Sequence, residues 1–450
     1  MDVTGSSAAK KEEASEELPP LTSVSAGGHC DKMDPTAAPT VDINSDAVDG
    51  VDGETQNSVL EQLLTGIFGD VDLRTVSLLS MSTLFMSLGN GATIAAMPTL
   101  CRDLGIGPLL FGATWAQVPL VKVVSNMPCT YLCMYWGRRP VLVFGRILEG
   151  ASTLLKGFVF SFSSILVVRT CVGLGNAANQ MSSTLVLSDV SVPANRARTF
   201  SSSSVAMNVG KCLGPLLAGC ISARAGVRMV FYVTGTLGLL GGLMSLAVPE
   251  TAPKEVLDKA QAQTLTDQVS DATKMQYRLL QHTQMLSGLV VSLCASATVA
   301  GLTYNVLPHF LMDRLGAGVP QQGVMHFTSG AVCVVSRIPA SFLCDKFGRR
   351  WPVIGGLLLM ACASGCIPLL RSWIQATVLQ VPESVGQTFV FTGIVPYVTD
   401  LWEQDVEARV QASSLAVITA ELGQLVGSPL LGLMCAVGSV KAACWVSSAG

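Results

Sequence analysis

The sequence predicts an all-α membrane protein built from two six-helix bundles that repeat each other along the chain. Three observations lead to this prediction: few charged residues, a series of long apolar runs, and an internal repeat. Half of the 450 residues are hydrophobic and only 13% are charged, whereas soluble domains carry about 25% charged residues. This number of charged residues is too small to cover the water-facing surface of a soluble protein of 450 residues. We therefore expect a bilayer to cover much of the surface.

The first 74 residues differ in composition from the rest of the chain. Residues 1–72 hold fifteen acidic residues against three lysines, whereas the other 378 residues hold sixteen acidic and twenty-five basic residues. No aromatic residue precedes Phe68, so too little apolar surface is available to offset the entropy of ordering this segment. We expect residues 1–74 to form a disordered, acidic, cytosolic tail that is neither a secretory signal nor a transit peptide.

Eleven apolar runs follow, each close to the roughly 20 residues that a helix needs to cross the hydrocarbon core. They lie at 76–98, 111–134, 139–160, 163–187, 199–221, 227–248, 285–307, 323–344, 351–370, 374–398 and 410–435. The first six predict an N-terminal bundle over 75–249, a polar stretch predicts a cytosolic linker over 250–284, and the others predict a C-terminal bundle over 285–450. A twelfth run starts near Val437 and is too short to span, so we expect an incomplete twelfth helix.

The distribution of basic residues in short loops predicts the orientation of the chain in the membrane. Lysines and arginines concentrate after the second, fourth and eighth runs, in loops that share one side, and such loops face the cytosol. The N-terminus is therefore expected to be cytosolic in an integral, multi-pass membrane protein. Nothing in the sequence distinguishes the plasma membrane from an organelle membrane.

The two halves of the chain repeat each other with a nearly constant shift. With a shift of 211 residues, Gly137, Arg138, Arg139, Asp189 and Arg198 recur as Gly348, Arg349, Arg350, Asp400 and Arg409. With a shift of 213, Gly210, Gly214 and Gly219 recur as Gly423, Gly427 and Gly432. Two parallel six-helix repeats with a substrate site between them are typical of secondary transporters. The paired charges predict a latch between loops and helix ends, although plain solvated charges remain an alternative.

Three segments resemble motifs of the major facilitator superfamily. Asp345-Lys346-Phe347-Gly348-Arg349-Arg350 resembles its loop signature, Arg169-x-x-x-Gly173-x-Gly175 resembles the motif of its fourth helix, and Gly210-x-x-x-Gly214-Pro215-x-x-Ala218-Gly219 resembles that of its fifth. The resemblance covers about residues 75–450 and is closest to the drug and small-solute proton antiporters. It implies the fold of that family, a gating role for the loop residues, and a central cavity lined by the first, fourth, seventh and tenth helices.

Two features bear on these motifs. In the first copy of the loop signature, Met134 stands where the family carries Asp. On the fifth helix, the spacing of Gly210, Gly214 and Gly219 favours close helix packing, and Pro215 favours a bend. Plain packing and a role in coupling are both open for this helix.

Polar residues follow one face of the fourth helix and one face of the tenth. Arg169, Asn176 and Gln180 share a helical face, as do Gln380, Glu383 and Gln387. Because lipid would reject such stripes, we expect both to line an interior cavity. The first helix adds Asn90 and the seventh adds Tyr304 and Asn305.

Charged residues within the apolar runs are further candidates for function, because charges inside a bilayer are costly. Glu383 and Glu421 are the candidate proton-coupling groups, because burial of a carboxylate favours its protonated form. A permanent ion pair with Arg169 or Lys211 is the alternative. Arg146 and Glu149 lie three residues apart on one helix and are expected to pair with each other.

These observations favour secondary active transport of a small organic solute by alternating access, with proton antiport as its coupled form. A facilitative or proton-symport nutrient carrier, similar to sugar carriers, and a transporter-like sensor without transport are the alternatives. No HExxH, GxSxG or phosphate-binding motif is present, so we expect no enzyme, cofactor or metal site. The expected partners are the substrate, protons and the lipid bilayer, with no nucleic acid, and the expected state is a monomer.

Overall fold

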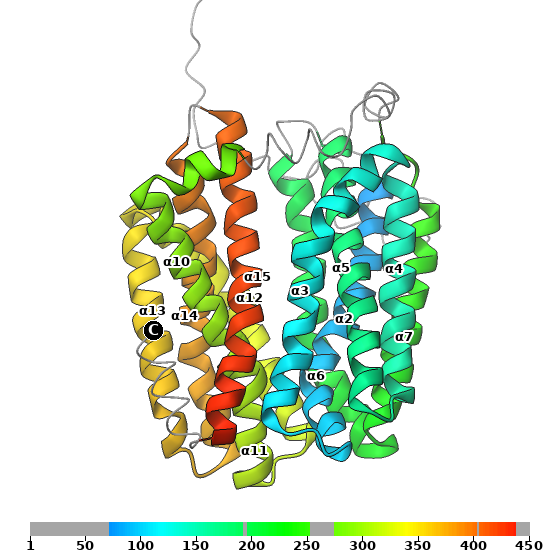
Figure 1. The fold of residues 1–450 in the computed structure, drawn as a ribbon, viewed down its shortest axis with the longest axis vertical. Helices are drawn as coiled ribbons and strands as arrows, with labels where there is room; N and C mark the ends of the chain where they lie inside the picture. The colour runs from blue at the N-terminus through cyan, green and yellow to red at the C-terminus, as the bar shows by residue number, and fades with distance from the viewer. Residues whose placement is uncertain (1–71, 192–195, 253–273, 403–404, 438–450) are drawn as a thin grey trace, which may run out of the picture. The chain divides into compact units, whose positions relative to one another are not determined.

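The computed structural model describes residues 72–191, 196–252, 274–402 and 405–437 (Figure 1). The chain divides into two units, Met1–Ser58 and Val59–Gly450, and the described residues all belong to the second. The predicted acidic tail up to residue 71, most of the predicted linker, and the predicted incomplete twelfth helix beyond Val437 lie outside the described residues.

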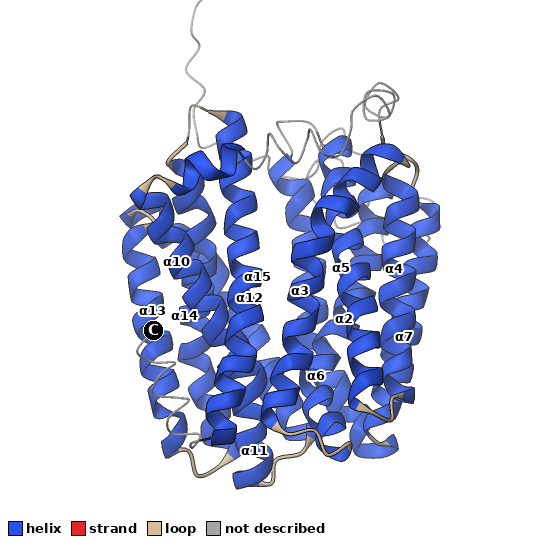
Figure 2. Cartoon of the chain, viewed as in Figure 1, coloured by secondary structure: helices blue, strands red, loops and turns tan. Residues whose placement is uncertain are grey.

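Helices make up almost all of the described part of the chain, and no strand occurs there (Figure 2). The first bundle contains α2 (Leu73–Asp103), α3 (Pro108–Tyr135), α4 (Arg138–Leu155), α5 (Phe162–Val190), α6 (Arg196–Ala225) and α7 (Val227–Met244). The second contains α10 (Thr283–Thr298), α11 (Leu307–Leu315), α12 (Val319–Phe347), α13 (Arg350–Cys366), α14 (Trp373–Asp400) and α15 (Val406–Val437). Each of the eleven predicted spans overlaps one of these helices, alone or together with a short helical segment that continues it, so the predicted all-α fold is confirmed.

One span is continuous but irregular. The π-helical segment η3 (Val299–Val306) joins α10 to α11, so all three form the seventh span. π-Helical turns are rare in proteins, and those that occur often lie at functional sites. Tyr304 and Asn305, which the sequence assigns to the cavity, both lie in η3.

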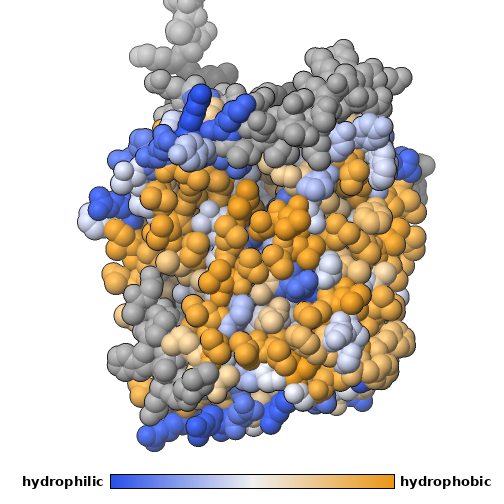
Figure 3. Space-filling view, in the orientation of Figure 1, coloured by the Kyte–Doolittle hydropathy of each residue, from blue (hydrophilic) through white to orange (hydrophobic). Residues whose placement is uncertain are grey.

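The surface of the visible face is that of a protein embedded in a membrane. Apolar side chains cover its middle, and polar side chains gather at its two ends (Figure 3). Seven helices in the described part of the chain are long and apolar enough to cross a bilayer. Helices α3, α4, α5 and α14 carry more polar residues. These polar side chains need neighbouring protein rather than lipid around them.

The helices pack in the same way in both bundles. In the first bundle α6 packs on α2, and in the second α15 packs on α10. Across the two bundles, α15 contacts α3 and α12 contacts α6. Helices α2–α7 and α10–α15 accordingly form two groups in Figure 1.

Glycines explain how closely α6 and α15 approach their partners. A Cβ atom on Gly210 would lie 2.7 Å from the Leu84 carbonyl oxygen of α2, and one on Gly219 would lie 3.1 Å from Pro320 of α12. On α15, Gly432 faces Pro108 of α3 in the same manner, at 2.7 Å. Without side chains at these positions the helix backbones can touch, so the repeated glycines serve packing within and between the bundles.

The two ends of the helices differ in how the bundles meet. We call the end that holds the α3–α4 and α12–α13 loops the basic end, and the other the opposite end. At the opposite end Arg102 forms an ion pair with Asp313 at 3.5 Å. Nearby, the rings of Phe111 and His309 meet edge to face, with centroids 4.9 Å apart. Both contacts join the first bundle to α11, so they close the interface at this end.

Candidate functional site

A cavity of about 630 Å³ lies between the two bundles and is lined by residues of both. The first bundle contributes Asn90, Trp115, Lys122, Glu149, Arg169, Asn176, Asn179, Gln180, Ser204 and Lys211, among others, and the second contributes Ser296, Tyr304, Gln387, Phe391, Glu421 and Gln424. The lining continues to Leu187 near the end of α5 and to Phe200 near the start of α6. The cavity therefore extends toward the basic end, while inter-bundle contacts close the opposite end.

Six of the nine residues that the sequence assigns to the cavity line it: Asn90, Arg169, Asn176, Gln180, Tyr304 and Gln387. The structure places Asn305, Gln380 and Glu383 elsewhere, because other groups bind their side chains. Glu383 accepts hydrogen bonds from Thr303 and Gln380, both at 2.5 Å, between η3 and α14. Asn305 donates to the Ser428 carbonyl at 2.8 Å and so joins η3 to α15.

Arg169 lines the cavity but its guanidinium is already engaged. Its Nε donates to the Thr114 carbonyl at 2.9 Å, and its guanidinium lies 4.6 Å from the centre of the Trp115 ring. The Trp115 ring in turn stacks on Tyr304 of the second bundle, at 5.5 Å between centroids and 25° between planes. Arg169 therefore positions an aromatic pair that spans both bundles.

Glu149 lies at the centre of a cluster of amides on the cavity wall. Its carboxylate accepts hydrogen bonds from Asn90 at 2.8 Å, Asn179 at 3.3 Å and Asn176 at 3.4 Å. The predicted direct pair with Arg146 is not formed. Instead Arg146 donates to the Asn179 side-chain oxygen at 2.9 Å, so the amide of Asn179 bridges the two charges.

Glu421 is paired with a lysine that the sequence did not connect to it. Lys122 on α3 and Glu421 on α15 form an ion pair across the two bundles, with only 11% and 10% of their side chains exposed. Neither Arg169 nor Lys211 takes this place. Lys122 and Glu421 are 299 residues apart in the chain, and no local pattern connects them.

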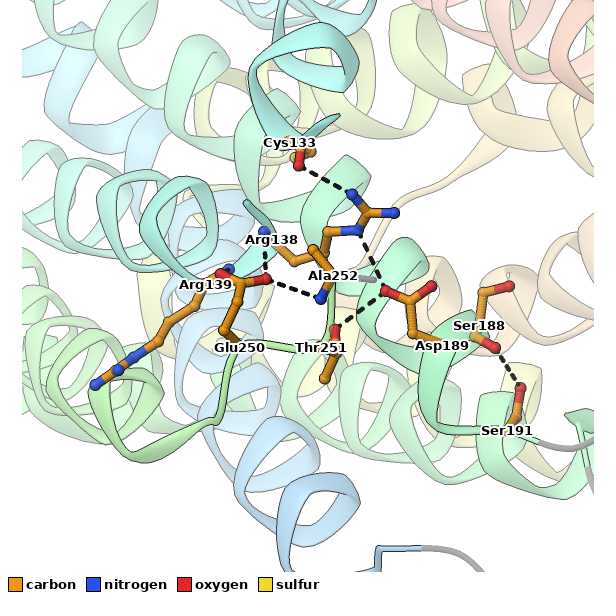
Figure 4. A network of polar contacts seen from close by, with 9 residues as sticks. All are labelled: Cys133, Arg138, Arg139, Ser188, Asp189, Ser191, Glu250, Thr251 and Ala252. Carbon is orange, nitrogen blue, oxygen red and sulfur yellow. Dashed lines mark hydrogen bonds and ion pairs between the residues drawn. The ribbon is translucent and has the colours of Figure 1, made fainter. Parts of the chain in front are cut away.

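The loop motif of the first bundle forms a network at the basic end (Figure 4). Arg138 donates to Asp189 at 3.2 Å and to the Cys133 carbonyl at 3.1 Å. Glu250 accepts hydrogen bonds from the backbone N–H groups of Arg138 and Arg139, at 2.9 and 3.0 Å. A carboxylate at a helix N-terminus satisfies unpaired N–H groups and interacts favourably with the helix dipole. The network is complete although this copy of the motif lacks its Asp.

The second bundle repeats the ion pair in a more exposed form. Arg349 pairs with Asp345 and, at 3.3 Å, with Asp400; both carboxylates raise the pKa of Arg349 above its usual value. Arg138–Asp189 and Arg349–Asp400 are thus equivalent contacts at the 211-residue shift. Gly137 and Gly348, which precede α4 and α13, both have a positive φ, of 103° and 78°, which L side chains rarely adopt.

The two aspartates lie at the ends of α5 and α14. Asp189 binds Arg138 at the start of α4, and Asp400 binds Arg349 just before α13. The side chain of Arg198 lies outside the described residues. Arg409 is exposed and, within the described part of the chain, forms no ion pair with Asp400. Lys346 lies over the Phe347 ring at 5.5 Å, and Arg350 is exposed at the start of α13.

The difference in burial between the two equivalent pairs yields a stability prediction. Replacing Arg138 by Gln leaves Asp189 and a carbonyl without a charged donor in a place where only 5% of the arginine side chain is exposed. We expect a loss of about 2–3 kcal/mol in unfolding free energy. Arg349→Gln, in the pair with 30% and 56% exposed side chains, should cost less than about 1 kcal/mol.

Apparent melting temperatures of the two purified variants in detergent check this prediction. Arg349→Gln is the matched control, because it makes the same chemical change at the equivalent position. Equal melting temperatures for both variants would contradict it.

Comparison with known proteins identifies a family with this architecture. The family model described as Major Facilitator Superfamily matches residues 79–310 and 288–449. An uncharacterized MFS-type transporter of Methanocaldococcus jannaschii is 21% identical over 373 residues, which cover 80% of this chain and 91% of that protein. The quinolone resistance protein NorA of Staphylococcus aureus is 26% identical over 196 residues, covering 43% of this chain and 50% of NorA. The likeness to NorA thus spans half of that protein.

Solved transporter structures share the fold. A bacterial homolog of the human lysosomal transporter Spinster, in an inward-facing and unoccupied conformation, matches with a TM-score of 0.67 and 18% identity over 81% of this chain and 82% of that one. A POT family transporter in complex with 5-aminolevulinic acid matches with a TM-score of 0.70 and 12% identity, covering 86% and 95%.

Proposed function

The chain belongs to the major facilitator superfamily, and from this premise we propose that it carries a small organic solute across a membrane by alternating access. The observation that supports this most is the cavity of about 630 Å³, which both bundles line and which inter-bundle contacts close at one end. Rocking of the bundles would open the opposite end and bring the basic ends together, so that the same lining faces the other side.

The orientation of the cavity follows from the basic loops. Arg138, Arg139, Arg349 and Arg350 lie at the end toward which the cavity extends, and such loops face the cytosol. In this proposal the described conformation is the inward-open one. The Arg138–Asp189 and Arg349–Asp400 pairs would then stabilise loops at the cytosolic rim of each bundle.

Proton coupling in this proposal uses Glu149 in place of Glu383. Glu149 lines the cavity, is 1% exposed, and is hydrogen-bonded by neutral amides. Glu421 is less suited because Lys122 pairs with it, and Glu383 is less suited because it does not line the cavity. Arg146 reaches Glu149 only through the amide of Asn179, so uptake of a proton by this carboxylate breaks no direct ion pair. The motif of the fifth helix favours exchange of proton against solute.

The test is transport by the purified protein in liposomes that contain a pH-sensitive dye. A panel of organic anions, cations and neutral solutes is offered with and without a pH gradient. We expect one class to move and to change the internal pH. Solute movement without pH change would favour the facilitative carrier, and no movement of any solute would favour the non-transporting sensor.

Two tryptophan variants separate transport through the cavity from leakage. Ser204 lines the cavity, so Ser204→Trp should fill it and reduce the transport rate at least about tenfold, because close-packed helices leave no room for an indole elsewhere. Val335 is 72% exposed on α12 and does not line the cavity, so Val335→Trp should transport as wild type. Equal rates in both variants would count against the cavity as the path.

A further inference from the structure

A smaller chamber of about 260 Å³ adjoins the cavity. We call it the side chamber. It shares Ile94, Lys211, Tyr304, Gln387 and Phe391 with the cavity. Helices α6 and α12 supply most of its remaining wall, including Asn208, Ser329 and Arg337. Because Lys211, Tyr304 and Gln387 line both spaces, one molecule can occupy part of each.

The side chamber holds two cations that the protein leaves without a counterion. Neither the Lys211 ammonium nor the Arg337 guanidinium has a hydrogen-bond or ion-pair partner anywhere in the described part of the chain. Both side chains are exposed, and both line the chamber. No aspartate or glutamate is among the residues described on its wall.

The two carboxylates that line the adjoining cavity are already engaged. Glu421 is paired with Lys122, and Glu149 is held by three asparagine amides. Both line the cavity rather than the side chamber. Charges within a membrane-embedded protein are normally paired, so the local excess of positive charge calls for a negative group from outside the protein.

We propose that the side chamber binds the anionic group of an organic acid, with Lys211 and Arg337 as its charge partners. This inference rests on the proposed function and names the class of solute. Asn208 on the same wall offers an uncharged donor. The rest of the solute lies in the cavity beside the stacked Trp115–Tyr304 pair, and aromatic rings pair favourably with an aromatic body.

The placement of Lys211 depends on the same close packing that holds the bundle together. A Cβ atom on Gly91 of α2 would lie 2.7 Å from the Lys211 carbonyl oxygen. The backbone of α6 at Lys211 therefore lies directly on α2, and Lys211 lines the cavity and the side chamber. A cationic solute would meet Lys211 and Arg337 as like charges, and like charges at short distance repel each other.

The test compares three probes with the same bicyclic body: 2-naphthoate, 2-naphthamide and 2-naphthylmethylammonium. Their binding to the purified full-length protein is measured by calorimetry. We expect naphthoate to bind at least about tenfold more tightly than the amide, the scale of one charge-assisted hydrogen bond, and the ammonium compound to bind most weakly. Equal binding of the three, or no binding, would overturn the proposal.

Variants at Lys211 show whether charge or shape decides. Lys211→Gln should weaken naphthoate binding about tenfold and leave the amide unchanged, whereas Lys211→Arg should preserve the preference. Lys211→Glu should reverse it, so that the ammonium compound binds better than naphthoate. Arg228→Gln is the control, because Arg228 lies over the Phe160 ring and lines neither space. An unchanged order of binding in Lys211→Glu would refute the assignment.

Arg337→Gln provides a second, independent variant if Lys211→Glu does not fold. It should also weaken naphthoate more than the amide, and equal effects on both would speak against the site. Anion-selective binding without flux in liposomes would disprove the transport function and leave the binding site standing. Flux limited to cationic solutes would support the transport function and disprove the anion-binding site.

Discussion

Glu149→Gln is expected to abolish proton-driven accumulation of the solute while the protein stays folded. Glutamine has nearly the same shape and can still bind the asparagines that surround position 149, at 2.8 Å for Asn90, but it cannot release or take up a proton. With one proton exchanged per solute, a pH difference of one unit sustains a solute gradient of about tenfold. In the variant this gradient should collapse to equality.

The measurement is solute accumulation in liposomes with an imposed pH gradient. Glu383→Gln is the matched control, since it makes the same change in a buried carboxylate that also accepts bonds from neutral donors but does not line the cavity. It should accumulate solute as wild type does. Loss of accumulation in Glu383→Gln together with normal accumulation in Glu149→Gln would instead support Glu383, the proton-coupling candidate named from the sequence.

Gly214→Leu is expected to have the largest effect on folding. A Cβ atom at this position would lie 2.7 Å from the Ala92 nitrogen and 2.9 Å from the Gly91 carbonyl carbon, both in the backbone of α2. Backbone atoms cannot rotate away as a side chain can, so α6 would have to separate from α2. Overpacking of this kind costs about 3 kcal/mol or more.

The apparent melting temperature and the yield of folded protein in detergent report this loss. Gly355→Leu is the control, because Gly355 is exposed on α13 and a Cβ atom there would have no neighbour within 4 Å. It should melt at or slightly above the temperature of wild type, since leucine favours a helix more than glycine does. If Gly214→Leu had the same melting temperature as wild type, the close approach of α2 and α6 would not be required for stability.

The sequence predicted the helical spans closely, because a bilayer imposes a length and an apolar character on every helix that crosses it. The predicted run 374–398, for example, corresponds to α14 (Trp373–Asp400). The spacing of the repeated glycines on the fifth and eleventh helices also favoured close packing of both helices. Which helix each glycine faces required the structure.

The candidate site was only partly predictable. Helical periodicity finds a polar face, and it grouped Asn176 and Gln180, which both line the cavity. It does not say which of several buried polar groups reaches solvent and which is bound by a neighbour. Glu383 is bound by Thr303, 80 residues away in the chain, and so lies off the cavity, whereas Glu149 is on it.

The sequence by itself determined a membrane fold of two repeated helical bundles, because length, hydropathy and repeats are properties of contiguous segments. The tertiary structure decided the charge balance of the cavity: Lys122 meets Glu421 from the other bundle, and Lys211 meets no partner within the described residues. The physical reason is that an ion pair depends on separations of a few ångströms, and only folding brings residues so far apart in the chain to such distances.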